Sequence, residues 1–112
     1  MPALSVTIDD LQLMYALAAF METRKTDAEF EGFIEDLVDE LPAVPNATGT
    51  MPMIFSLSQQ AVNTVHCIAA YAAYIGEHEG ECEEMAERAA ELACVLPPVR
   101  QTAVIDGDRD IA

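Results

Sequence analysis

Apolar side chains recur at steps of three and four residues in four segments of the chain, a spacing that places them on one face of an α-helix. The segments cover residues 8–23, 27–41, 52–78 and 81–96. Pro42 ends the second segment, and Pro97 and Pro98 end the fourth, because proline cannot continue a helix. The pattern predicts an all-α fold, a compact four-helix bundle formed by residues 1–97.

The first and third segments are apolar around more than half of their circumference. The main stripe of the third segment consists of Ile54, Leu57, Ala61, Val65, Ile68, Ala72 and Ile75. A second column of that segment consists of Cys67, Tyr71, Tyr74 and His78. A helix that is apolar nearly all round needs cover on several sides. We therefore expect a homodimer with an isologous interface formed by residues 8–23 and 52–78.

Local motifs indicate where the helices begin. Thr7 and Asp10 have the spacing of a capping box before the first helix. Residues 42–52 contain three prolines and one glycine, which predicts a loop, and Thr50 is expected to cap the helix that follows. Glycines at positions 76 and 80 leave open whether residues 76–81 break the third helix or continue it.

Residues 98–112 have no helical period, so we expect an extended or flexible tail. Within it, residues 99–105 have the composition of a short strand or a partner-binding segment.

Composition limits the kind of partner. The 112 residues are 52% hydrophobic, which predicts one folded domain, yet 20 acidic residues against five basic ones give a net charge of −15. Such a chain is repelled by nucleic acids and anionic membranes, so we expect no direct binding to either. The start lacks a basic leader, the apolar runs are too short to span a bilayer, and three unpaired cysteines suit a reducing compartment. These features predict a cytoplasmic protein.

Acidic side chains gather on the polar faces of two predicted helices. On the fourth helix they are Glu81, Glu83, Glu84, Glu87 and Glu91, and on the second they are Glu31, Glu35 and Asp39. Like charges four residues apart destabilise a helix, so their crowding suggests a use. A solvated face that confers solubility is one interpretation. The other is a protein-binding surface that attracts a basic partner by electrostatic steering.

The sequence contains no complete catalytic or metal-binding motif. His78 and Cys82 are four residues apart, but two ligands do not make a zinc site. Cys67 follows His66 directly, and neighbours on a helix face different directions, so they cannot form a thiolate–imidazole pair. We read Cys67 as a small core residue. We expect no catalytic residues, no metal and no cofactor.

The function predicted from these observations is a small non-enzymatic protein that binds a basic partner. Inhibitors, immunity proteins, antitoxins and nucleic-acid mimics share these properties. The alternative is a dimeric helical enzyme or small-ligand sensor with an internal pocket, which would be lined by Asn63, His66, Tyr71, Tyr74 and His78. A structural or assembly factor that acts through its tail is a third interpretation.

Overall fold

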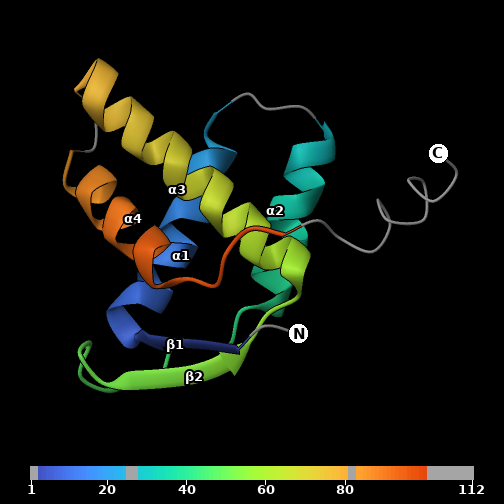
Figure 1. Ribbon diagram of the computed structural model, residues 1–112, viewed down its shortest axis with the longest axis vertical. Helices are drawn as coiled ribbons and strands as arrows, with labels where there is room; N and C mark the ends of the chain where they lie inside the picture. The colour runs from blue at the N-terminus through green and yellow to red at the C-terminus, as the bar shows by residue number, and fades with distance from the viewer. Residues whose placement is uncertain (1–2, 25–27, 81–82, 101–112) are drawn as a thin grey trace, which may run out of the picture.

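The computed structural model describes residues 3–24, 28–80 and 83–100, which form four helices and one two-stranded sheet. In chain order the elements are β1 (Ala3–Thr7), α1 (Ile8–Glu22), α2 (Ala28–Glu40), β2 (Pro52–Ser56), α3 (Gln59–Glu79) and α4 (Glu83–Val95). The prediction of an all-α four-helix bundle is wrong, because the antiparallel pair of β1 and β2 is part of the fold (Figure 1).

The first part of the predicted third helix is the strand β2. Met53 and Phe55 are partly buried against the core, whereas Ile54 between them is 78% exposed. Ile54 and Leu57 also fit the helical stripe, so over so few residues the spacing of apolar positions does not separate a strand from a helix. Pairing with β1, which lies far away in the sequence, decides between them.

The start of α3 follows from this correction. Ser58, not Thr50, caps the helix, and its Oγ accepts a hydrogen bond from the backbone N–H of Ala61 at 3.1 Å. The carboxylate of Glu40, at the end of α2, accepts hydrogen bonds from the backbone N–H and the hydroxyl of Ser58, both at 2.7 Å. These contacts join the end of α2 to the beginning of α3.

The predicted capping box of α1 is confirmed. The hydroxyl of Thr7 accepts a hydrogen bond from the N–H of Asp10 at 3.2 Å, and the Asp10 carboxylate accepts one from the N–H of Thr7 at 3.0 Å. Thr7 is also the last residue of β1, so the strand passes directly into the helix. The box therefore fixes the angle at which α1 leaves the sheet.

Gly80 ends α3. Its φ of 69° lies in the left-handed region, where glycine carries no steric penalty. Gly76 lies inside the helix and does not interrupt it. The sequence left open whether the third helix breaks at residues 76–81, and in the structure the helix ends at Gly80. The next described residue, Glu83, begins α4.

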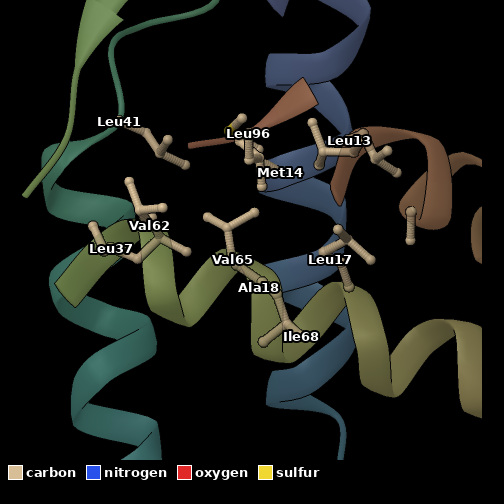
Figure 2. Close-up of a cluster of buried hydrophobic side chains, with 14 of the residues drawn as sticks. Leu13, Met14, Leu17, Ala18, Leu37, Leu41, Val62, Val65, Ile68 and Leu96 are labelled. Atoms are coloured by element: carbon tan, nitrogen blue, oxygen red, sulfur yellow. The ribbon is translucent and has the colours of Figure 1, made fainter. Parts of the chain in front are cut away.

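The core forms where α1 crosses the other helices (Figure 2). Helix α1 contacts α2, α3, α4 and β1, so its apolar sides are covered by its own chain. The side chains at this crossing are Leu13, Met14, Leu17, Ala18, Leu37, Leu41, Val62, Val65, Ile68 and Leu96. The predicted stripe of α3 is buried from Ala61 to Ile75. The homodimer through residues 8–23 and 52–78 stays a prediction.

Candidate protein-binding surface

A groove runs along the seam between α3 and α4, which lie side by side (Figure 1). It consists of two hollows of about 330 and 390 Å³ that share Ala73 and Ala90, and we call it the α3–α4 groove. Its floor is made of small residues: Ala70, Ala73, Gly76, Ala86, Ala90 and Ala93. Because these side chains end in a methyl group or a hydrogen, the surface they offer is apolar and shallow.

The same small residues explain why the two helices approach closely. Ala69 and Ala89 are almost completely buried in the seam, while Ala70 and Ala90 are exposed beside them. Alanines at steps of three and four keep small side chains on one face along several turns. The helices therefore pack tightly below the groove and leave its floor open to a partner.

One end of the groove is negatively charged. Glu77, Glu83 and Glu87 line that hollow and are exposed. In the part of the chain that the structure describes, none of the three carboxylates takes part in an ion pair or a hydrogen bond to a side chain. The nearby Arg88 instead donates to the backbone carbonyl of Asp9 at 3.2 Å. The rim thus carries a negative charge that the described residues do not neutralise.

The acidic residues singled out in the sequence do not form one surface. Those on α4 are exposed, and those on α2 are also exposed but lie on the other side of α3 (Figure 1). The α4 set is Glu83, Glu84, Glu87 and Glu91, and the α2 set is Glu31, Glu35 and Asp39. Glu81 lies outside the described residues. Of these residues, Glu83 and Glu87 line the α3–α4 groove, whereas Glu84 lines a separate hollow between α1 and α4.

The residues of the alternative ligand pocket are likewise separated. Tyr71 is 36% exposed and Tyr74 is 54% exposed. The Tyr74 ring lies 4.4 Å from the ring of His78, which is also on the surface. Asn63 and His66 lie on a neighbouring stripe of α3 and contact the chain after α4. The five side chains therefore do not line a common cavity in the described part of the chain.

The segment after α4 lies along the first half of α3, and we call residues 97–100 the strap. A ring nitrogen of His66 is 2.7 Å from the carbonyl oxygen of Pro97, and Gln59 donates to that of Pro98 at 3.1 Å. Asn63 donates to the carbonyl of Arg100 at 2.7 Å and accepts from its N–H at 3.2 Å. The strap is thus held by hydrogen bonds to its main chain.

The strap borders the neutral end of the groove. Val99 lines the hollow that also contains His66 and Cys67. The sequence analysis assigned Asn63 and His66 to the alternative ligand pocket and did not predict that they hold the strap. The available signal was the spacing of Gln59, Asn63 and His66 at steps of four and three residues, which places them on one face of the helix. Both hollows are open to solvent, and they differ in charge, since the acidic rim lies beside the hollow lined by Glu77, Glu83 and Glu87.

Other chemistry has little support in the described residues. No three His, Cys, Asp or Glu side chains among them come together as ligands for a metal ion. The prediction that Cys67 is a core residue is wrong, since both Cys67 and Cys94 are exposed thiols. No described helix has the length and apolar character needed to cross a membrane.

Comparisons with protein-family models, curated proteins and solved structures found no match to the chain.

Proposed function

We propose that this protein is a non-enzymatic binding module that holds a basic, amphipathic segment of a partner protein in the α3–α4 groove. The observation that supports this proposal is the apolar floor of the groove next to the carboxylates of Glu77, Glu83 and Glu87, which have no ion-pair partner among the described residues. Inhibitors, immunity proteins, antitoxins and nucleic-acid mimics are the classes that this activity would fit, because each blocks a basic protein surface.

The two parts of the groove have different tasks in this proposal. The apolar floor receives the apolar stripe of the partner, as in other complexes in which a helix lies in a groove. Lysine or arginine side chains of the partner reach the glutamates at the rim. The net charge of −15 accelerates the encounter with a basic protein and makes its rate sensitive to salt.

The rim is tested with a synthetic helical peptide that carries alanine and leucine on one face and lysine and arginine on the other. Its affinity is measured by fluorescence anisotropy for the wild type and the double variant Glu83→Gln/Glu87→Gln. We expect binding to weaken by about 2- to 30-fold, since exposed ion pairs contribute about 0.2–1 kcal/mol each. The control, Glu31→Gln/Glu35→Gln, removes the same charge from α2 and should leave the affinity nearly unchanged.

The floor is tested by filling it. Ala90→Leu places a larger side chain between the two hollows, and we expect it to reduce peptide affinity at any salt concentration. Ala19→Leu makes the same exchange at an exposed position of α1 and serves as the control. Equal affinities of the two variants would contradict a partner seated in the groove.

Capture from cells of the native host at low and high salt tests the class of partner. We expect basic proteins that are released as salt rises and that are not retained by Glu83→Gln/Glu87→Gln. If the retained proteins are neutral or acidic and their retention ignores salt, the proposed function is wrong.

A further inference from the structure

Strand β2 forms the outer edge of the sheet. The sheet contains β1 and β2 in that order, and β1 lies between β2 and the helices (Figure 1). At the centre of β2, Ile54 is 78% exposed. An exposed edge strand presents backbone groups that can pair with another strand.

The hydrogen-bond pattern shows which backbone groups of β2 face outward. The N–H of Ile8 donates to the carbonyl of Met51 at 3.0 Å, which fixes the phase of the antiparallel ladder. In that phase, Met53 and Phe55 exchange their hydrogen bonds with β1. The N–H and carbonyl of Ile54 therefore point away from β1, and they have no backbone partner within the described residues.

The other edge of the sheet is protected at the end of β1. In the same phase the N–H of Thr7 points away from β2, and it is occupied by the Asp10 carboxylate at 3.0 Å. A charged side chain at a strand edge discourages pairing with another chain. β2 has no such protection, because residues 41–76 contain no Asp, Glu, Lys or Arg. Of the two edges, that of β2 is the one without a charged side chain beside its outward backbone groups.

Charge favours a second copy of this chain as the occupant of this edge. Two molecules of net charge −15 repel each other, so they can associate only where few carboxylates are brought together. The charge-free stretch 41–76 includes all of β2 and the loop before it. A basic partner would find no carboxylate on this stretch to pair with, whereas a second copy meets little repulsion from it.

We propose that two copies pair through antiparallel β2 strands with Ile54 opposite Ile54 of the partner subunit. A strand in this arrangement is its own complement, so the contact is isologous and closes as a dimer. The two Ile54 residues exchange both hydrogen bonds, and each Ser56 N–H donates to the Pro52 carbonyl of the other copy. Pro52 has no N–H to donate, but it lies at the end of the strand, where proline is tolerated. The product is a four-stranded sheet, β1-β2-β2-β1.

The dimer is tested by sedimentation equilibrium over a wide range of protein concentration. The wild type should approach 24.4 kDa, twice the chain mass of 12.2 kDa. Ile54→Pro removes the outward N–H and leaves the bonds to β1 in place, so it should remain at 12.2 kDa with an unchanged far-UV circular dichroism spectrum. Ile54→Thr keeps the N–H and a β-branched side chain, and it should still dimerise.

Each result counts for or against the pairing. A wild type that stays monomeric at every concentration contradicts it, as does a dimeric Ile54→Pro or a monomeric Ile54→Thr. If Ile54→Pro does not fold, Ile54→Lys places two like charges opposite each other and should be monomeric. Ser5→Lys, on the exposed face of β1, is its control and should remain a dimer.

Salt separates this inference from the proposed function. Screening weakens the repulsion between two acidic subunits, so added salt should favour the dimer. The same salt should weaken binding of the basic peptide at the α3–α4 groove. The two responses have opposite signs, and failure of one therefore leaves the other intact.

Discussion

The Glu40 carboxylate joins the end of α2 to the beginning of α3, and we predict that Glu40→Ala destabilises the fold by about 2 kcal/mol. An acidic residue in the last turn of a helix opposes the helix dipole, whereas one at the start of a helix is stabilising. Glu40 is the last residue of α2, and its carboxylate also lies at the start of α3, where it accepts two hydrogen bonds of 2.7 Å from the cap residue Ser58. The favourable interaction with the start of α3 should outweigh the unfavourable one with the dipole of α2.

The size of the effect follows from these contacts. A hydrogen bond to a charged group contributes about 1.5–3 kcal/mol when it is shielded from water. Because Glu40 is only partly buried, water competes with both bonds, and we expect them to contribute about 2 kcal/mol together. With an unfolding entropy of about 2.1 cal/mol/K per residue, this loss lowers the Tm by about 8 °C. Urea titration and thermal unfolding, both followed by circular dichroism, measure the change.

Glu35→Ala is the matched control, because it removes the same side chain and charge from an exposed position of α2. Its effect should stay within about 0.5 kcal/mol. A double-mutant cycle with Ser58→Ala then isolates the contact and should give a coupling free energy of about 1 kcal/mol. Equal losses in Glu40→Ala and Glu35→Ala, or a coupling free energy of zero, would refute the reasoning.

Two further predictions concern the turn after α3 and the strap. Gly80→Ala should destabilise by about 1 kcal/mol in urea titrations, because a φ of 69° is unfavourable for alanine. Gly32→Ala, inside α2 and with open space around the added methyl group, should instead stabilise by about 0.5–1 kcal/mol, and effects of the same sign would contradict this account. Asn63→Ala should accelerate tryptic cleavage after Arg100 by about 5- to 30-fold, since two hydrogen bonds to the strap are lost. A change no larger than that in Gln12→Ala, at an exposed site of α1, would argue against this role of the strap.

Local patterns in the sequence were sufficient to locate three helices closely. The starts and ends of α1, α2 and α4 lie within two residues of those of the predicted segments 8–23, 27–41 and 81–96. The capping box at Thr7 was also predictable, because its donors and acceptors lie within four residues of each other. Interactions over such short separations depend little on the rest of the fold.

The identity of residues 52–57 was not predictable in the same way. Ile54 fits a helical stripe with Leu57, and it also fits the alternation of a strand. The pairing of β2 with β1, about fifty residues earlier in the chain, decided that this segment is a strand and not a helix. That pairing turned Ile54 from an expected core residue into a strand residue that is 78% exposed.

The sequence by itself determined which residues are apolar enough to be buried, where most helices begin and end, and that acidic side chains remain on the surface. Only the tertiary structure decided which acidic residues adjoin an apolar groove, that Asn63 and His66 hold the strap, and that β2 is an edge. The physical reason is that the first set depends on neighbours three or four residues apart. The second set depends on segments that meet only after the chain has folded.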